Sequence, residues 1–379
     1  MPVTVDLIAA ARPNFMKVAP LYKALAPETS WCRVRLVHTG QHYDANMSDA
    51  FLRGLGLPEP EVHLGIGGGS HAQQTGGVMI AYEEECLRSH PDWVVVVGDV
   101  NSTIACTLAA KKLGIQVAHL EAGLRSGDRS MPEELNRIAT DALADLLWTP
   151  SADGDQNLAR EGVPRERIEM VGNIMIDSLE MMRASIQSRH HARALGLERG
   201  QFGVVTLHRP SNVDDAEQLA KVVNVVIAAA ARLPIVFPVH PRTRKMLEAS
   251  GLLARLTQAP GVKATEPLGY TDFMSLIFDC RYVLTDSGGI QEETTYLGIP
   301  CLTLRENTER PITVTQGTNR LVRAETVQRQ IEAILAGKSP KGTVPPLWDG
   351  KTAGRIARSL RVAARGSPTN NAKNSRGRP

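Results

Sequence analysis

Short apolar runs rich in Val and Ile recur along the chain, and each is followed by a polar or glycine-containing turn and a segment of helical periodicity. The run 94–97 is four valines, which is typical of a strand covered on both faces, as in a parallel sheet. We predict strands at residues 3–9, 34–39, 93–98, 117–120, 146–149, 203–207, 235–239, 282–285 and 301–304. The repeated strand–turn–helix order predicts an α/β fold with two doubly wound domains.

The two series of strands are separated by a polar helical stretch between residues 170 and 200. We therefore expect a first domain at residues 1–172 and a second at residues 173–350. The segment 351–365 predicts an amphipathic helix that packs back on the first domain. Residues 366–379 are rich in Ser, Asn, Gly and Pro, and they predict a disordered tail.

The composition of the 379 residues excludes several classes of protein. Hydrophobic residues make up 42% and charged residues 22%, so global disorder is excluded. The net charge of +3 is too small for a polyanion-binding protein, and 4% aromatic residues argue against stacking surfaces for single-stranded nucleic acid. We expect no nucleic-acid partner.

The cysteines and the N-terminal sequence indicate the expected cellular compartment. The five cysteines are dispersed and form no C-x-x-C pair, which predicts reduced thiols in a cytoplasmic protein. The N-terminus lacks a basic segment before its apolar run, so no signal peptide is expected. No apolar run approaches the roughly 20 residues that span a bilayer, so we expect no membrane partner.

Charged and histidine residues follow almost every predicted strand. The segments are 12–17, 40–42, 98–103, 119–126, 207–210, 240–244, 285–293 and 305–310. Open α/β sheets bind ligands at the carboxyl ends of their strands, beside helix N-termini that attract phosphate. Any single one of these residues could be an ordinary surface charge or helix cap, but the whole set predicts a ligand site.

The segment 285–293, Thr-Asp-Ser-Gly-Gly-Ile-Gln-Glu-Glu, is the sharpest local signal. Ser287 can cap the following helix, and Gly288 and Gly289 let backbone N–H groups approach a diphosphate. We expect Glu292 and Glu293 in the first helical turn, where a carboxylate can reach a ribose diol. Taken alone, the motif is also compatible with an ordinary N-cap followed by two glycines.

Other ligand and catalytic templates are absent from the sequence. There is no G-x-G-x-x-G after residues 3–9, no G-x-x-x-x-G-K-[ST] and no G-x-S-x-G. These absences disfavour a dinucleotide-dependent dehydrogenase, a P-loop nucleotidase and an α/β-hydrolase. The histidines lack metal-ligand spacing, so we expect no metal site.

A series of ordered motifs carries a resemblance to a known family. They lie at residues 12–20, 39–42, 98–100, 119–125, 132–137, 208–209 and 286–293. Through them the chain resembles the non-hydrolysing UDP-N-acetylglucosamine 2-epimerases over residues 3–365. The resemblance implies two Rossmann-like domains in the arrangement called GT-B, with a UDP-sugar substrate in the cleft between them, and a homodimer.

The activity implied by the resemblance is reversible inversion at C2, which converts UDP-N-acetylglucosamine to UDP-N-acetylmannosamine without NAD or another cofactor. The C2 hydrogen is not adjacent to a carbonyl, so a base alone could hardly remove it. Departure of UDP builds oxocarbenium character at C1 and acidifies C2–H, giving a 2-acetamidoglucal to which UDP returns. Cations and N–H donors stabilise the leaving group, and carboxylates move the proton on either face.

The resemblance also implies residue roles. It assigns acid/base work at C2 to Asp99, Glu121 and Glu133, and contact with the departing diphosphate to His208. The implied substrate-binding residues are Arg12, Lys17, Arg137, Phe273, Ser287, Gly288, Gly289, Glu293 and Arg310. Among these, Phe273 is expected against the uracil and Glu293 on the ribose. The alternative roles are helix caps for Asp99 and Glu121, and a first-turn helix position for Glu133 after Pro132.

The chain departs from the family pattern in two places. Asn14 and Phe15 stand where many members have Glu-Ala. Residues 41–44 read Gln-His-Tyr-Asp where members activated by their own substrate have Gln-His-Arg, and residues 65–74 contain no arginine. We therefore predict no substrate activation at a second site. A hydrolysing 2-epimerase, an epimerase of another UDP-2-acetamido sugar, a GT-B glycosyltransferase and a catalytically silent UDP-sugar sensor remain as alternatives.

Overall fold

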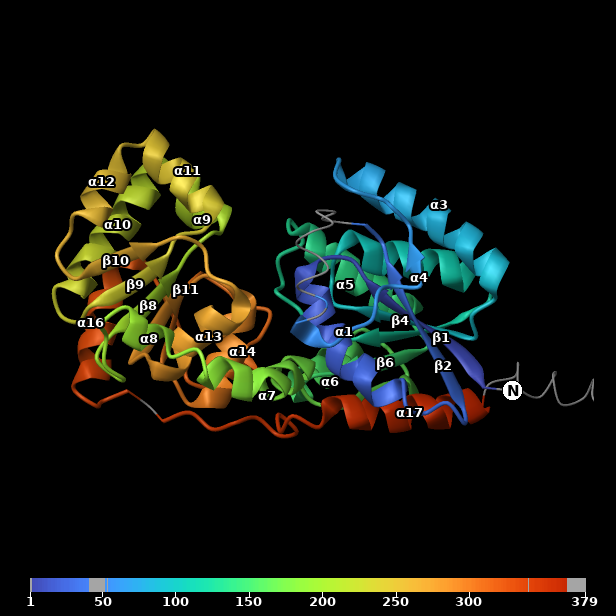
Figure 1. Cartoon of the computed structure of the whole chain (residues 1–379). Helices are drawn as coiled ribbons and strands as arrows, with labels where there is room; N and C mark the ends of the chain where they lie inside the picture. The colour runs from blue at the N-terminus through green and yellow to red at the C-terminus, as the bar shows by residue number, and fades with distance from the viewer. Residues whose placement is uncertain (1, 41–51, 53, 340, 367–379) are drawn as a thin grey trace, which may run out of the picture. The chain divides into compact units, whose positions relative to one another are not determined.

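The chain forms two compact units, each with its own sheet. The computed structural model describes residues 2–40, 52, 54–339 and 341–366. Unit 1 extends to Glu180 and resumes at Pro346, and unit 2 is Met181–Pro345. Each unit contains one sheet whose strand pairs are parallel (Figure 1). The predicted α/β class with two doubly wound parts is confirmed.

The sheet of unit 1 has the strand order β3-β2-β1-β4-β5-β6-β7. Its strands are β1 (Val3–Ala9), β2 (Cys32–His38), β3 (Val62–His63), β4 (Trp93–Val97), β5 (Gln116–Leu120), β6 (Leu146–Thr149) and β7 (Ile168–Met170). Its helices are α1 (Arg12–Leu25), α3 (His71–Ser89), α4 (Asn101–Lys112), α5 (Pro132–Leu143), α6 (Ala152–Arg160) and α17 (Thr352–Gly366), and α7 (Ile174–Gln187) runs across the boundary between the units. Figure 1 shows α3 and α4 on one side of the sheet and α1 and α17 on the other.

The sheet of unit 2 has the order β10-β9-β8-β11-β12-β13. Its strands are β8 (Gly203–Thr206), β9 (Ile235–Pro238), β10 (Val262–Thr265), β11 (Tyr282–Thr285), β12 (Cys301–Leu304) and β13 (Asn319–Val322). Its longer helices are α10 (Ala216–Ala230), α11 (Pro241–Ala249), α13 (Tyr270–Asp279), α14 (Gly288–Leu297) and α16 (Ala324–Leu335). Shorter helices are α8 (His191–Ala194), α9 (Pro210–Val213), α12 (Leu252–Thr257) and α15 (Ile312–Thr315).

Four strands were not predicted from the sequence, and all four lie at sheet edges. These are β3 and β7 in unit 1 and β10 and β13 in unit 2. Each has only two to four residues, and its residues are buried only in part. An edge strand borders solvent, so its sequence need not be continuously apolar, and its pairing is decided by the neighbouring strand.

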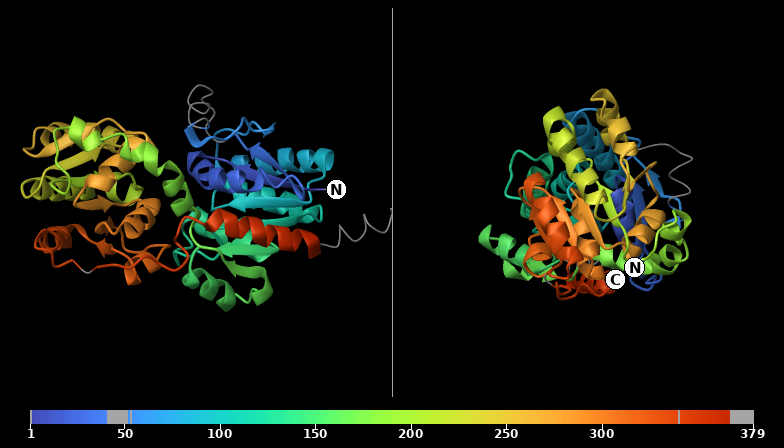
Figure 2. Two further views of the ribbon diagram at one scale, coloured as in Figure 1. Left: turned by 60° about the horizontal axis from the view of Figure 1, so that its bottom comes forward. Right: turned by 90° about the vertical axis from the view of Figure 1, so that its left-hand side faces the viewer.

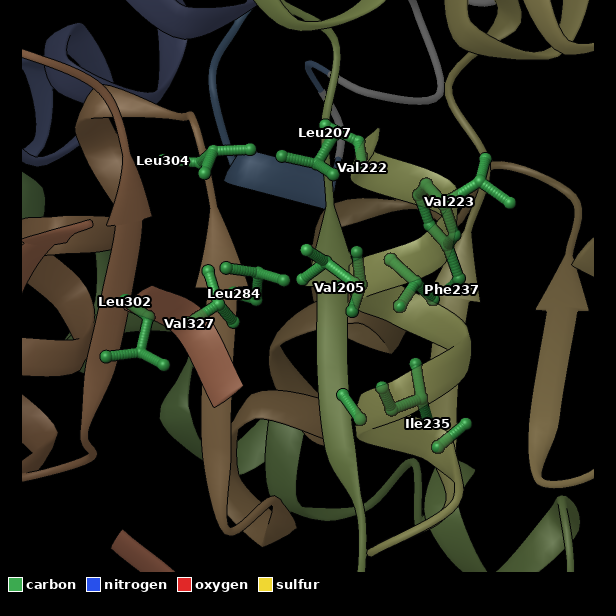
Figure 3. Close-up of a cluster of buried hydrophobic side chains, with 14 of the residues drawn as sticks. Val205, Leu207, Val222, Val223, Ile235, Phe237, Leu284, Leu302, Leu304 and Val327 are labelled. Atoms are coloured by element: carbon green, nitrogen blue, oxygen red, sulfur yellow. The ribbon is translucent and has the colours of Figure 1, made fainter. Parts of the chain in front are cut away.

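Each sheet is buried against helices by apolar side chains. All five residues of β4 are buried, and Val94 and Val96 join a cluster with α3 and α4. In unit 2 the corresponding cluster joins β8, β9, β11 and β12 to α10 and α16 (Figure 3). Val205 and Phe237 lie there among Val222 and Val223 of α10. Burial of this kind stabilises by about 25 cal/mol per Å² of apolar surface.

The last helix returns to unit 1, where α17 packs along α1 (Figures 1 and 2). Two indole N–H groups connect the N-terminal part of unit 1 to its C-terminal segment. Trp148 donates to Ser359 Oγ at 2.9 Å, and Trp348 donates to the carbonyl of Pro150 at 2.9 Å. Over the described part of the chain, no helix combines the length and the apolar character needed to cross a bilayer.

The strand order indicates where a ligand is expected to bind in each unit. In unit 1 the strands before β4 are added on one side of β1 and the later strands on its other side, so the strand order reverses between the neighbours β1 and β4. In unit 2 it reverses in the same way between β8 and β11. In open α/β sheets ligands bind outside the carboxyl ends of the strands at such a switch point. A ligand site is therefore expected at the segments that follow β1, β4, β8 and β11.

Candidate functional site

The segment after β4 carries Asp99. Gly98 has φ +68°, a left-handed conformation that favours glycine, and its N–H donates to the carbonyl of Leu120 at 3.0 Å. The Asp99 carboxylate then pairs with the Arg137 guanidinium, and its backbone carbonyl accepts from Asn136 Nδ2 at 2.9 Å. Asp99 is about one-third exposed, so its carboxylate is both held and accessible.

Glu121 follows β5 directly and has a backbone conformation that is rare for its type. Its φ of +71° lies in the left-handed region, where side chains with a Cβ are strained by roughly 1–3 kcal/mol. Oε2 accepts a hydrogen bond from Lys17 Nζ, while Oε1 is buried and has no hydrogen-bond partner among the described residues. A buried acceptor without a partner is costly, which is more typical of functional sites than of cores.

Helix α1 supplies the cation to this cluster. Asn14 accepts from the N–H of Ala11 at 3.1 Å and donates to the carbonyl of Val97 at 3.0 Å, which links the helix start to the end of β4. A Cβ at Gly98 would lie 3.4 Å from Lys17 Nζ and 3.7 Å from Glu121 Oε2. The segments bearing Lys17, Asp99 and Glu121 therefore lie against one another.

Helix α5 brings two adjacent glutamates with different environments. Glu133 is exposed, whereas Glu134 is 1% exposed and accepts from the backbone N–H groups of Ser126 and Gly127 and from Arg137. Burial favours the neutral form of Glu134, but these donors outweigh it and lower its pKa. Arg137 thus lies between Glu134 and Asp99, and Glu134 holds the arginine in place.

The sequence-predicted residues of unit 1 therefore fall into three groups. Lys17, Glu121, Asp99 and Arg137 form two ion pairs on neighbouring segments. Glu133 lies in the first turn of the helix that carries Arg137, and its side chain is exposed. Arg12 opens α1, but its side chain lies outside the described residues, as do residues 41–44 of the segment used to predict the absence of substrate activation.

In unit 2, His208 follows β8 and is held by a buried carboxylate from the end of β11. Asp286 is fully buried and accepts from the backbone N–H groups of His208 (3.0 Å) and Arg209 (2.9 Å) and from Asn212 Nδ2 (3.1 Å). His208 Nδ1 lies 3.1 Å from Asp286 Oδ1. Burial raises the pKa of Asp286, but His208 and these donors outweigh it, so the net shift is downward.

A cavity of about 260 Å³ opens beside His208. It is lined by Thr206, His208, Pro238, His240, Pro267, Leu268, Phe273, Ser287 and Ile290. The His208 and His240 rings are 5.3 Å apart, and burial together with the neighbouring His208 lowers the pKa of His240. The cavity combines an apolar wall with a few polar groups, as small-molecule sites do.

Helix α14 differs from expectation in two respects. Ser287 occupies the N-cap position, but its side chain makes no capping hydrogen bond, so the predicted cap is wrong; the residue lines the cavity instead. The helix begins at Gly288, so its first turn contains no acidic residue. Glu292 and Glu293 therefore lie in the second turn, and the expectation that they lie in the first is also wrong.

Glu293 is a buried carboxyl group on α14. Its exposed fraction is 2%, and Oε1 accepts from the Tyr270 hydroxyl at 2.7 Å. Burial, assisted by the neighbouring Glu292, raises the pKa of Glu293 to about 7, although the Tyr270 hydrogen bond acts in the opposite direction. Near neutral pH both the neutral and the ionised form of this carboxyl group are therefore present, and either form can accept a hydrogen bond from a ligand hydroxyl.

Arg310 lies against the start of α14. It pairs with Glu309 at 2.5 Å and with Glu292 at 2.9 Å. A Cβ at Gly288 would lie 2.7 Å from Glu309 Oε1 and 2.8 Å from Arg310 Nη1, so only glycine fits there without displacing the pair. At Gly289 a Cβ would meet nothing within 4 Å, so that position is open.

Several residues that hold these groups were not predicted as site residues: Asn14, Glu134, His240, Tyr270 and Asp286. Asp286 and His240 lie in the polar segments after strands, so their position was a usable signal. Tyr270 and Glu134 act through contacts between elements, which no local pattern reveals. Among the described residues, no cluster of three or more His, Cys, Asp or Glu side chains could hold a metal ion.

Comparison with known proteins gives a consistent result. The family model described as UDP-N-acetylglucosamine 2-epimerase matches residues 24–361. The UDP-N-acetylglucosamine 2-epimerase of Methanocaldococcus jannaschii is 40% identical over 364 residues, covering 94% of this chain and 98% of that protein. A UDP-2,3-diacetamido-2,3-dideoxy-D-glucuronate 2-epimerase of Pseudomonas aeruginosa is 41% identical over 321 residues, covering 84% and 87%.

A solved structure agrees with these sequence relationships. The crystal structure of the M. jannaschii UDP-GlcNAc 2-epimerase in complex with UDP-GlcNAc and UDP has a TM-score of 0.84 at 39% identity, covering 95% of this chain and 100% of that chain. With the family model matched over most of its length, the chain belongs to the UDP-N-acetylglucosamine 2-epimerase family.

Proposed function

We propose that this chain interconverts UDP-N-acetylglucosamine and UDP-N-acetylmannosamine without releasing the free sugar. The C1–O bond to UDP breaks, the C2 proton passes to a carboxylate, and a 2-acetamidoglucal with a C1–C2 double bond forms. A proton is then delivered to the opposite face of C2, and UDP oxygen re-forms the bond to C1. No hydride moves in this route, so it requires no redox cofactor.

The observation that carries the proposal is the pairing of two carboxylates with two cations at the ends of adjacent strands. Asp99 follows β4 and pairs with Arg137, and Glu121 follows β5 and pairs with Lys17. Two independently held carboxylates can serve the two faces of one carbon, whereas a glycosyl transfer usually needs one base. Glu133 would supply a further acid/base group from the first turn of α5.

Lys17, Arg12 and Arg137 add positive charge for the reacting end of the substrate in this proposal. The side chain of Lys17 is only 12% exposed, so its charge acts in a poorly hydrated environment. Binding of an anionic substrate would offset the cost of holding these cations out of water.

Unit 2 would bind the UDP moiety. Phe273 and Ile290 line the cavity together with Ser287 at the start of α14, and in this proposal they contact the uracil. The N-terminus of α14, with Gly288 and Gly289, offers backbone N–H groups and the positive end of the helix dipole to the diphosphate. Glu293 would accept from a ribose hydroxyl.

His208 would stabilise the departing UDP. His208 lines the same cavity as Ser287, and Asp286 contacts both its backbone N–H and its Nδ1. Arg310, which pairs with two glutamates beside Gly288, would add positive charge near the diphosphate.

Proton NMR in deuterated water tests the proposed reaction. The enzyme offered UDP-N-acetylglucosamine alone is expected to produce UDP-N-acetylmannosamine with deuterium at C2 and with the UDP linkage intact. Accumulation of free N-acetylmannosamine and UDP would establish the hydrolysing reaction instead. An unchanged UDP-sugar that nevertheless binds would establish a silent sensor.

A second substrate has a specific observation in its favour. The P. aeruginosa relative that is 41% identical is named for a diacetamido uronate rather than for N-acetylglucosamine. The two UDP-sugars should therefore be compared in parallel under identical conditions. We expect faster C2 exchange with UDP-N-acetylglucosamine, and a higher kcat/KM for the diacetamido uronate would reverse the assignment.

A further inference from the structure

A fully buried histidine–aspartate pair lies beneath the proposed acid/base residues of unit 1. His119 is on β5, two residues before Glu121, and Asp141 is on α5. Both side chains are 0% exposed, and His119 Nδ1 lies 2.6 Å from Asp141 Oδ1. The other ring nitrogen, Nε2, lies 2.8 Å from the carbonyl oxygen of Gly98.

The partners of the two ring nitrogens determine where the protons lie. The carbonyl oxygen of Gly98 can only accept, so Nε2 must carry a proton. Asp141 also accepts from the N–H of Gly123 at 3.0 Å and pairs with Arg125 at 2.8 Å. An aspartate with these partners is ionised and acts only as an acceptor, so Nδ1 must carry a proton as well.

The charges that face the pair alternate in sign. Arg125 pairs both with Asp141 and, at 2.7 Å, with Glu161, which is the more exposed end of the series. The order Glu161, Arg125, Asp141, His119 therefore places each charge beside an opposite one. A doubly protonated His119 completes this series, whereas a neutral ring would leave Asp141 facing an unprotonated nitrogen at 2.6 Å.

The same pair connects the three segments that carry the proposed acid/base residues. Through Nε2, His119 holds the carbonyl of Gly98, the residue before Asp99. Through its second oxygen, Asp141 holds the N–H of Gly123, two residues after Glu121. Asp141 itself lies on α5, the helix that also carries Glu133, and it follows Arg137 by four residues, so Asp141 and Arg137 lie on the same side of that helix.

We propose that His119 carries protons on both ring nitrogens and, with Asp141, is a positioning residue that fixes the segments bearing Asp99 and Glu121. The positioning role rests on the proposed function, because that function assigns acid/base catalysis at C2 to the two carboxylates. The protonation state does not depend on it.

The protonation state is tested on the intact enzyme by ¹⁵N NMR of labelled histidine at pH 8, where exposed histidines are neutral. The His119 signal, assigned as the one lost in His119→Gln, is expected to show a bonded proton on each ring nitrogen. Should His119→Gln fail to fold, Asp141→Asn assigns the same signal, because an asparagine N–H would replace the acceptor at Nδ1. A His119 ring with one bare nitrogen in the wild type would overturn the proposal.

The positioning role is tested by separating turnover from binding. His119→Gln can retain a donor to Gly98 but cannot hold Asp141 at the same time, so we expect kcat for C2 exchange to fall about 10²-fold, as small misplacements of catalytic groups do. The affinity for UDP should not change. His90→Asn, an exposed histidine of the same unit in a left-handed conformation that asparagine tolerates, is the matched control and should retain full activity.

The two proposals fail in different ways. Full turnover in a folded His119→Gln variant would overturn the positioning role and leave the epimerase function standing. Absence of C2 exchange in the wild-type enzyme would overturn the epimerase function and with it the positioning role, while the histidine spectrum would still decide the protonation of His119.

Discussion

At the scale of the residue, the candidate-site residues of the two units include side chains whose backbone conformation or burial costs free energy. Glu121 has a left-handed backbone and a buried oxygen without a partner among the described residues. Glu293 is a carboxyl group buried next to Glu292, and burial raises its pKa to about 7. Costs of this kind are maintained where a ligand or a reaction requires them.

The proposed acid/base roles predict large effects from small substitutions. Asp99→Asn, Glu121→Gln and Glu133→Gln each preserve shape but remove the carboxylate, so turnover should fall about 10²–10⁴-fold with the fold intact. Steady-state epimerisation assays measure the effect. Glu84→Gln, an exposed glutamate on α3, is the control. A variant that keeps most of its activity removes that residue from the mechanism.

His208 should affect binding as well as turnover. Loss of the proposed hydrogen bond to the diphosphate in His208→Ala is expected to weaken UDP binding by roughly 10–100-fold, corresponding to about 1.5–3 kcal/mol. Titration calorimetry with UDP measures this, with the exposed His190→Asn as the control in the same unit. Unchanged affinity would show that His208 does not contact the diphosphate.

Glu293 should make the stability of unit 2 depend on pH. Its pKa is about 7 in the folded chain against an ordinary 4.5, so between these values the folded state holds a proton that the unfolded state lacks. The free energy of unfolding therefore falls as pH rises from 4.5 to 7. Glu293→Gln removes this penalty and should be more stable than the wild type at pH 8, by up to roughly 3 kcal/mol.

Calorimetric unfolding at pH 8 and pH 4 measures the stability difference between Glu293→Gln and the wild type. Little difference is expected at pH 4, because both side chains are then neutral, and Gln can still accept from Tyr270. The same variant should bind UDP more weakly at pH 8, and comparison with the wild type cancels the ionisation of UDP itself. Equal stability of the two proteins at pH 8 would argue against a raised pKa.

At the scale of the element, the site depends on how strands end. Gly98 and Gly123 both follow strands of unit 1, and both have positive φ. Helix α5 packs beside these strand ends. Its Arg137 pairs with Asp99 after β4, and its Asp141 accepts from the N–H of Gly123 after β5, so one helix holds both segments. The loops are therefore set by contacts between elements more than by their own sequence.

Two glycines allow the stability cost of a left-handed backbone to be separated from the cost of a steric clash. Gly114 and Gly123 have similar φ, +74° and +78°, but a Cβ meets nothing within 4 Å at Gly114 and lies 2.5 Å from the carbonyl oxygen of Gly154 at Gly123. Gly114→Ala should cost about 1–2 kcal/mol for the left-handed backbone alone. Gly123→Ala should cost clearly more, because helix α6 must also move. Urea denaturation compares them, and equal costs would contradict the contact.

At the scale of the whole molecule, the chain has two cores and one returning helix. The N-terminal part and α17 together form unit 1, and the hydrogen bond between Trp148 and Ser359 connects residues 211 positions apart. The proposed reaction assigns the acid/base residues to one unit and the UDP-binding residues to the other. The homodimer implied by the resemblance stays a prediction.

The distribution of tryptophan makes the two units separately observable, because all four tryptophans belong to unit 1. Ile356→Ala on α17 deletes a fully buried side chain and should lower the stability reported by tryptophan emission by about 2–5 kcal/mol. UDP binding, assigned to unit 2, should be unaffected under conditions where the variant is folded. Val362→Ala, 72% exposed on the same helix, is the matched control and should have little effect.

Much of the architecture could be predicted from local sequence because buried parallel strands are continuous apolar runs. Nine runs predicted nine strands, and the polar segments after them indicated where a ligand site would lie. The four edge strands were missed because their residues, such as those of β10, are only partly buried and carry no continuous apolar signal. Their pairing depends on a neighbour that local sequence does not contain.

The amino-acid sequence alone therefore determined the fold class, the family and the residue types available for chemistry. Only the tertiary structure decided which of two adjacent glutamates on α5 is buried, because that depends on the phase of the helix against the sheet. It likewise decided that Glu121 takes a left-handed conformation and that His119 meets Asp141, 22 residues away. Periodicity is local information, whereas the positions of polar side chains in a site follow from non-local packing.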